Sequence, residues 1–194
     1  KAKRIRPASH GRAKLRSREA VEPLRRPELY RPAGAGTGRP EQAPFPRLVA
    51  HRGLSGLCPE NTLPAFGAAV ALGVEEIELD VWGSKDGELV VCHDDALDRT
   101  TTGSGRIGEL DWPQLARLDA GVRFGENWRN IRLPRLEDVF AAFAGRVVMN
   151  IHLKEPGRDG WVVGKTAALA AQYGIARQVY LAGLKDVLVW AAKL

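Results

Sequence analysis

Short apolar runs alternate with helix-like segments from residue 47 onward. The runs that predict strands are residues 48–50, 76–81, 88–92, 147–154 and 178–181. The segments that predict helices are one that is capped at Asn61 or Thr62 and stops at Gly73, and then residues 136–143, 161–173 and 186–194. Strands that alternate with helices in this way build a parallel sheet covered by helices, so the pattern predicts an α/β fold.

One pair of strands breaks the alternation. Asp86-Gly87 is a strong tight-turn signal, and it separates residues 76–81 from residues 88–92 without room for a helix. We therefore expect a hairpin there. A two-residue turn would place His93 directly opposite Asp80, which would bring an imidazole next to a carboxylate.

The strand at residues 76–81 carries two acidic side chains on one face. Glu78 and Asp80 are two residues apart, so both point to the same side of a strand while Leu79 points to the other. Inward-facing carboxylates on a central strand are costly unless a cation pairs them, and hard cations prefer oxygen ligands. The pattern favours a metal site; the alternative is a solvated polar face on an edge strand.

Composition separates the beginning of the chain from the rest. Residues 1–46 hold 12 Lys and Arg against 4 Glu, are rich in Pro and Gly, and have no sustained apolar period. Such a segment cannot bury enough apolar surface to order itself, so we expect a disordered basic tail. It could contact nucleic acid or anionic lipid, or it could be a solvated extension or a misassigned start of the reading frame.

The remaining bulk properties exclude some classes of protein. No apolar stretch reaches the roughly 18 to 20 residues that a transmembrane helix needs, so we expect no transmembrane segment. Cys58 and Cys92 are the only cysteines, and two thiols so far apart make neither a disulfide framework nor a zinc site. No secretory signal is visible, and a cytoplasmic location is the simplest expectation.

Five short motifs together resemble the glycerophosphodiester phosphodiesterase family. They are His51-Arg52-Gly53, Pro59-Glu60-Asn61-Thr62, Glu78-Leu79-Asp80-Val81, His93-Asp94 and Arg99-Thr100-Thr101. Their order and spacing make coincidence improbable. The resemblance implies a TIM-type (β/α) barrel, of which this chain would hold the N-terminal portion, because such a barrel needs eight strands and about 250 residues. The barrel would therefore be incomplete at the C-terminus, with residues 47–194 as the phosphodiesterase domain.

The resemblance also assigns chemistry to particular residues. It makes His51 and His93 the catalytic pair, one taking a proton from the nucleophile and the other giving one to the leaving alcohol. It makes Arg52 and Lys154 the cations that contact the phosphate. By themselves, a histidine in a strand is more often a hydrogen-bonded core residue, and an arginine or lysine is often a surface ion pair.

The third metal ligand departs from the family pattern. Where most members have Glu, this chain has His152, and the alternation of a strand turns His152 inward together with Lys154. Family resemblance implies Mg²⁺ or Ca²⁺ at a site of Glu78, Asp80 and this residue, whereas an imidazole ligand favours Mn²⁺, Co²⁺ or Zn²⁺. Alternatively, His152 turns aside to a neighbour or to the phosphate.

The expected reaction is metal-dependent hydrolysis of a small glycerophosphodiester to glycerol 3-phosphate and an alcohol. The rival reactions are those of a lysophospholipase D or a sphingomyelinase D on the same scaffold. An alternative hypothesis of a different class is an inactive fragment whose basic tail binds anions. We expect no specific nucleic-acid partner, because the basic tail lacks the interleaved aromatic residues that stack on bases; the pattern leaves the oligomeric state open.

Overall fold

The computed structural model describes residues 46–194. The predicted tail at residues 1–46 therefore lies outside the described residues, apart from Pro46. Within the described part of the chain, no helix is both long and apolar enough to cross a membrane.

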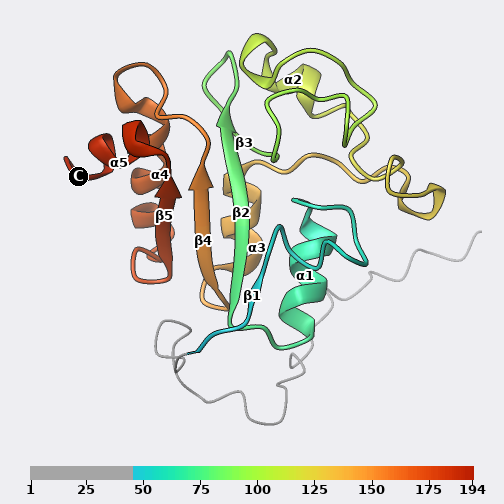
Figure 1. Ribbon diagram of the computed structural model, residues 1–194, viewed down its shortest axis with the longest axis horizontal. Helices are drawn as coiled ribbons and strands as arrows, with labels where there is room; N and C mark the ends of the chain where they lie inside the picture. The colour runs from blue at the N-terminus through green and yellow to red at the C-terminus, as the bar shows by residue number, and fades with distance from the viewer. Residues whose placement is uncertain (1–45) are drawn as a thin grey trace, which may run out of the picture. The chain divides into compact units, whose positions relative to one another are not determined.

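Four parallel strands and one antiparallel strand form a single sheet (Figure 1). The strands are β1 (Val49–Ala50), β2 (Glu76–Gly83), β3 (Leu89–Val91), β4 (Val148–Leu153) and β5 (Val179–Gly183). The parallel strands lie in the order β1-β2-β4-β5, and β3 pairs antiparallel with β2. The α/β prediction is confirmed, and the parallel order follows the chain, as in a barrel wall.

Helices lie between the strands and after the last of them. They are α1 (Leu63–Ala71), α2 (Trp112–Leu115), α3 (Leu136–Phe143), α4 (Trp161–Gln172) and α5 (Lys185–Ala191). Short 3₁₀ turns occupy Ile107–Glu109, Glu126–Trp128 and Arg158–Gly160. Thr62 caps α1 by accepting a hydrogen bond from the Ala65 amide, as one of the two predicted caps.

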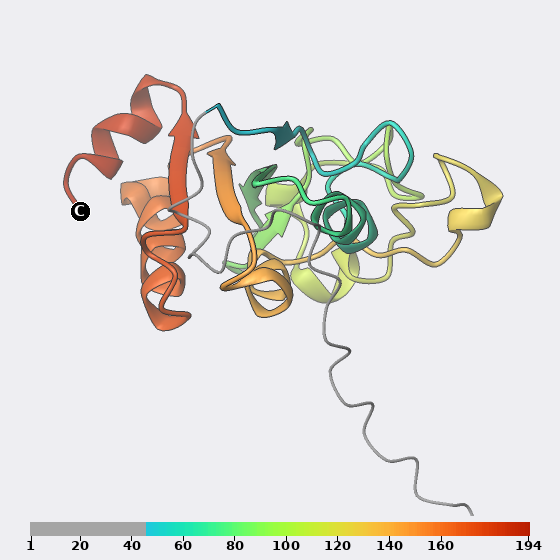
Figure 2. The ribbon, with the colours of Figure 1, turned by 90° about the horizontal axis from the view of Figure 1, so that it is seen from below.

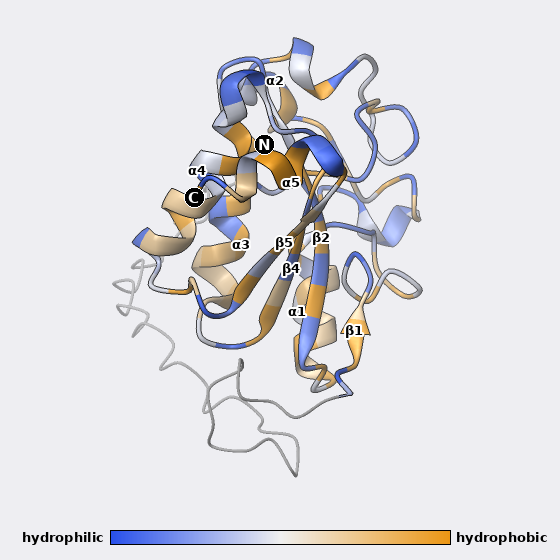
Figure 3. Cartoon of the chain, turned by 60° about the vertical axis from the view of Figure 1, so that its left-hand side comes forward, coloured by the Kyte–Doolittle hydropathy of each residue, from blue (hydrophilic) through white to orange (hydrophobic). Residues whose placement is uncertain are grey.

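The two faces of β2 have opposite characters. Ile77, Leu79 and Val81 belong to one apolar core with buried side chains of α1, α3 and α4, and Figure 2 shows α3 and α4 on the same side of the sheet. The intervening Glu78 and Asp80 are also buried, on the face turned away from these helices. This alternation appears in Figure 3 as changing colours along the strands. The sheet therefore separates an apolar layer from a buried polar one.

The β2–β3 hairpin has a different register from the one that its turn signal predicts. Val81 pairs with Val91, and one step further the Cys92 amide donates to the Asp80 carbonyl at 3.1 Å. Cys92, not His93, is therefore opposite Asp80, and the predicted pairing is wrong. The loop has three residues, because the Ser84 amide bonds to the Glu88 carbonyl and the turn ends with Gly87 at φ 86°.

The carboxyl ends of the parallel strands carry the polar residues that the sequence singles out. His51 follows β1, and Lys154 follows β4. The register between β2 and β4 pairs Glu78 with Asn150 and Asp80 with His152, so the inward residues of the two strands are neighbours. In barrels of this type the active face lies at these strand ends.

The apolar layer gives the first testable prediction. Phe140 on α3 is fully buried and makes an edge contact with Tyr173, whereas Phe124 is 46% exposed. We expect Phe140→Ala to lower the free energy of unfolding by about 3 to 5 kcal/mol, because it leaves a cavity in the core. Phe124→Ala should cost less than about 1 kcal/mol. Urea unfolding of both variants measures this, and equal losses would contradict the assigned core.

Candidate active site

The turn after β1 holds Arg52 in an unusual backbone conformation. Arg52 has φ 56° and Gly53 has φ 77°, and the Gly53 amide closes the turn on the Ala50 carbonyl at 3.1 Å. A non-glycine residue in the left-handed region costs free energy and persists only where the surroundings impose it. Here the conformation turns the Arg52 amide toward Glu78, whose carboxylate accepts its hydrogen bond at 2.9 Å.

Gly53 cannot be replaced without strain. A Cβ atom there would lie 2.7 Å from the backbone carbon of Ala65, in addition to the positive φ. The close approach packs the turn against α1, and a further bond from the Leu54 amide to the Ala65 carbonyl holds it there. This explains why the motif after β1 ends in glycine.

Glu78, Asp80 and His152 come together as the sequence predicts. Each offers a ligand atom, and these atoms all lie within 4.8 Å of one another. The His152 Nδ1 atom is 3.4 Å from an Asp80 oxygen. The Lys154 ammonium lies 2.8 Å from the same oxygen and 3.4 Å from His152 Nδ1. Lys154 thus neutralises Asp80, a role that the prediction of phosphate contact did not include.

The environment of the cluster shifts two of its pKa values. Burial, and then the neighbouring Asp80 charge, raise the pKa of Glu78. Burial, and then the Lys154 ammonium, lower the pKa of His152. A lowered pKa leaves the imidazole neutral at pH 7, which is the form that binds a metal ion. A cation placed here would favour the ionised form of Glu78.

Asn61 has a role that its sequence position did not reveal. It lies in the loop before α1 with φ 56°, and its side-chain amide donates to an Asp80 oxygen at 2.8 Å. Its side-chain oxygen in turn accepts from the Asp80 amide at 3.2 Å. The residue therefore clamps Asp80 rather than capping the helix, which Thr62 does. The Pro-Glu-Asn-Thr motif was the only signal for it in the sequence.

The residues present fit a divalent cation. Metal–oxygen and metal–nitrogen contacts are about 2.0 to 2.6 Å long, so atoms less than about 5 Å apart can share one ion. Within the described residues, two buried side-chain atoms lack a hydrogen-bond partner, Arg52 Nε and Asn150 Oδ1. Asn150 is the cross-strand neighbour of Glu78. This amide oxygen has lone pairs but no partner, and a cation or a water molecule bound to the cation would satisfy it.

His93 approaches this cluster from the loop after β3. Its Nδ1 atom lies 2.5 Å from the Asp94 carboxylate, and its charge contributes, after burial and Lys154, to lowering the pKa of His152. Arg99 first, and then His93, lower the pKa of Asp94. Because an ionised Asp94 can only accept, the shared proton belongs to His93 Nδ1. The Nε2 atom of His93 is thereby left for proton exchange.

His51 lies at the exposed side of the cluster. Its side chain is 68% exposed, and its Nε2 atom is 3.9 Å from a Glu78 oxygen. The imidazole is therefore next to the carboxylate pair and in contact with solvent. Of the residues that the sequence predicts for the site, His51, Arg52, His152 and Lys154 lie beside Glu78 or Asp80. His93 is near enough for its charge to act on His152.

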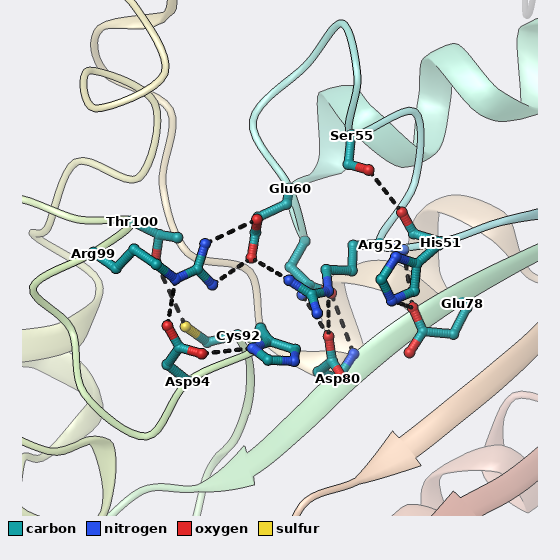
Figure 4. Close-up of polar contacts among 12 residues, drawn as sticks. His51, Arg52, Ser55, Glu60, Glu78, Asp80, Cys92, Asp94, Arg99 and Thr100 are labelled. Carbon is teal, nitrogen blue, oxygen red and sulfur yellow. Dashed lines mark hydrogen bonds and ion pairs between the residues drawn. The ribbon is translucent and has the colours of Figure 1, made fainter.

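Two arginines and a glutamate connect the loops above the cluster (Figure 4). Glu60 accepts from Arg52 at 3.1 Å, and Arg99 donates to both Glu60 oxygens at 2.7 and 3.0 Å. Burial acts to raise the pKa of Glu60, but the two guanidinium groups outweigh it and the pKa is lowered. Arg52 Nε also lies 3.5 Å from Asp80. Glu60 is thus bound by two arginine side chains and does not belong to the cluster of Glu78, Asp80 and His152.

Known proteins are similar to this chain over the part that contains the candidate site. The sequence model of the glycerophosphoryl diester phosphodiesterase family matches residues 51–180. The glycerophosphodiester phosphodiesterase of Caldanaerobacter subterraneus is 44% identical over 108 residues, which is 55% of this chain and 44% of the relative. The chain thus spans about half the length of the curated relatives that it matches.

Solved structures agree with the fold. A phosphodiesterase from Oleispira antarctica, in complex with the product sn-glycerol-3-phosphate, superposes with a TM-score of 0.70 at 32% identity over 77% of this chain and 62% of the other. The glycerophosphodiester phosphodiesterase of Agrobacterium tumefaciens superposes with a TM-score of 0.69 at 34% identity, over 76% of this chain and 64% of the other. The expected TIM-type fold is confirmed.

The turn after β1 gives the second prediction. We expect Gly53→Ala to lower the free energy of unfolding by about 1 to 3 kcal/mol, through backbone strain and the clash with Ala65. The control is Gly56→Ala, where a Cβ would meet nothing within 4 Å. Urea unfolding compares the two. A Gly53→Ala variant as stable as Gly56→Ala would show that the turn can relax.

Proposed function

The chain belongs to the glycerophosphoryl diester phosphodiesterase family, and on that premise we propose that it carries the acid–base and metal-binding part of an enzyme that hydrolyses glycerophosphodiesters. The products would be glycerol 3-phosphate and an alcohol. One observation carries this proposal: His51, two cationic side chains and a three-residue ligand cluster meet at the carboxyl ends of β1, β2 and β4. His93, in the loop after β3, lies near enough for its charge to act on His152.

The two histidines would move the protons. Hydrolysis requires a base that takes a proton from the attacking nucleophile. It also requires an acid that protonates the leaving oxygen, so that the product leaves as a neutral alcohol. His93 is oriented by Asp94 and presents Nε2, which suits one of these roles. His51 is exposed and can exchange protons with solvent, which suits the other.

Arg52 and Lys154 would bind the anionic phosphate. Charge builds up on the phosphoryl oxygens in the transition state, and cationic donors that are already held in place stabilise it. Arg52 is fixed through its amide on Glu78 and its guanidinium on Glu60. Lys154 is held on Asp80, from which its ammonium can also face a ligand bound at the strand ends.

Glu78, Asp80 and His152 would hold the metal ion. A divalent cation bound there supplies positive charge that polarises a phosphoryl oxygen. An imidazole in place of a third carboxylate removes one negative charge and adds a softer donor, so we propose a preference shifted toward Mn²⁺, Co²⁺ or Zn²⁺ and away from Mg²⁺ and Ca²⁺. Asp80 would then be shared between the ion and Lys154.

The first test of this function concerns the histidines. We expect His51→Ala and His93→Ala each to reduce kcat for glycerophosphocholine by about 100- to 10,000-fold, because each removes a proton transfer. Release of glycerol 3-phosphate measures the rate, and a lysophospholipid run in parallel separates the lysophospholipase D alternative. Thermal unfolding controls for misfolding. Activity within about tenfold of the parent for either folded variant would contradict the two-histidine mechanism.

The second test concerns the metal preference. We expect Mn²⁺, Co²⁺ and Zn²⁺ to bind the metal-free protein more tightly than Mg²⁺ or Ca²⁺, and His152→Glu to shift this order back toward the hard cations. Calorimetric titration measures affinity without any assay, and the visible absorption of bound Co²⁺ reports on nitrogen ligation. An identical order of affinities for parent and variant would remove His152 from the ligand set.

A further inference from the structure

Arg99 lies in the loop after β3 and contacts two carboxylates from different parts of the chain. Its terminal nitrogens donate to both oxygens of Glu60 at 2.7 and 3.0 Å, and its Nε donates to Asp94 at 2.5 Å. The guanidinium group is planar and rigid, so one side chain sets the relative positions of both carboxylates. The proposed reaction gives Arg99 no part, although Arg99 begins one of the motifs that carry the family resemblance.

Each of the two carboxylates holds a residue of the proposed site with its other contacts. Asp94 faces Nδ1 of His93 at 2.5 Å, and Glu60 accepts from Arg52 at 3.1 Å. The result is a continuous chain of alternating charges, in which the labelled Asp94, Arg99, Glu60 and Arg52 follow one another (Figure 4). Arg99 is its central member.

The pKa shifts within this row of alternating charges support an orienting function for Arg99. The Arg99 hydrogen bond is the largest cause of the lowered pKa of Asp94, and Arg99 and Arg52 together outweigh burial at Glu60. Both carboxylates are therefore ionised at neutral pH and act only as acceptors. An acceptor fixed beside Nδ1 selects the imidazole form that carries its proton there and leaves Nε2 bare.

We propose that Arg99 is a positioning residue that orients His93 through Asp94 and Arg52 through Glu60. The proposal rests on the proposed function, since it assigns these two targets their roles. Arg99 is 48% exposed, and exposed ion pairs contribute little to stability. Its expected effect is therefore on the geometry of the site, with little effect on folding.

The same loop offers a matched control. Arg106 forms an ion pair with Asp95, and its side chain is 65% exposed. In the described part of the chain, that pair makes no hydrogen bond or ion pair with His93, Arg52 or the cluster of Glu78, Asp80 and His152. Arg106→Ala thus removes an arginine ion pair of the same loop while leaving the charge chain intact.

Steady-state kinetics form the first arm of the test. We expect Arg99→Ala to lower kcat and to raise KM for glycerophosphocholine, with kcat/KM falling about 10- to 100-fold. Arg99→Lys should recover part of this loss, because an ammonium can bind one carboxylate but cannot bridge both. Arg106→Ala should match the parent. An unchanged KM would overturn the link to Arg52, and kinetics equal to those of Arg106→Ala would overturn the whole proposal.

Nitrogen NMR of the imidazoles forms the second arm and needs no activity. The chain has 4 histidines, so ¹⁵N-histidine labelling gives a spectrum simple enough to assign with His93→Ala. For the neutral imidazole of His93, we expect a proton on Nδ1 in the parent and in Arg106→Ala, and a mixture of tautomers in Arg99→Ala. The same tautomer in all three would overturn the link to His93. If the parent does not cleave glycerophosphocholine, the proposed function fails, and this arm alone decides the link.

Discussion

The burial of two like charges on one face of β2 is the constraint on which the site depends. Glu78 and Asp80 are 7% and 1% exposed, and the opposite face of their strand is packed under helices, so neither can turn away. Two carboxylates this close to each other and this far from water are stable only beside positive charge or donors. The surrounding loops and β4 supply both, through Arg52, Asn61 and Lys154. Burial and the neighbouring Asp80 charge still raise the pKa of Glu78, so the donors and cations around it compensate its buried charge only in part. The cluster therefore suits a further cation.

The side chains around the buried pair are more exposed to solvent, and ion pairs hold them in place. We call Glu60, Asp94 and Arg99 the rim of the site. Asp80 is held by an amide clamp and an ammonium, whereas the rim is held by Arg99 between Glu60 and Asp94. A buried clamp fixes the ligands within a low-dielectric layer. The rim is partly solvated, where ion pairs add little to stability and act chiefly by fixing orientation. The site thus combines a buried region that would bind the cation with a more exposed region that would orient the residues for chemistry.

Two parts of the site escaped prediction for physical reasons. The turn signal predicts His93 opposite Asp80, but Ser84 and Glu88 close a three-residue loop that shifts the register, and Cys92 takes that place. A dipeptide such as Asp86-Gly87 fits both a two-residue turn and a three-residue loop ending in a left-handed glycine, and neighbouring contacts decide between them. The sequence predicts Asn61 as one of two alternative helix caps, because short polar residues favour caps. Its contact with Asp80 spans 19 positions of the chain, so no local pattern indicates it.

The sequence by itself determined the order of the strands and main helices, the inward face of β2, and a helix cap at Asn61 or Thr62, since strand alternation and capping act over a few residues. Together with the family resemblance, it also selected Glu78, Asp80 and His152 as a group. Only the tertiary structure decided how Lys154 divides its charge between Asp80 and His152, how Asn61 holds Asp80, and how Arg99 joins the two loops. These contacts connect segments whose separation in space depends on the packing of β1, β2, β4 and the loop after β3. No local rule specifies that separation, because it is the result of every strand register and loop length at once.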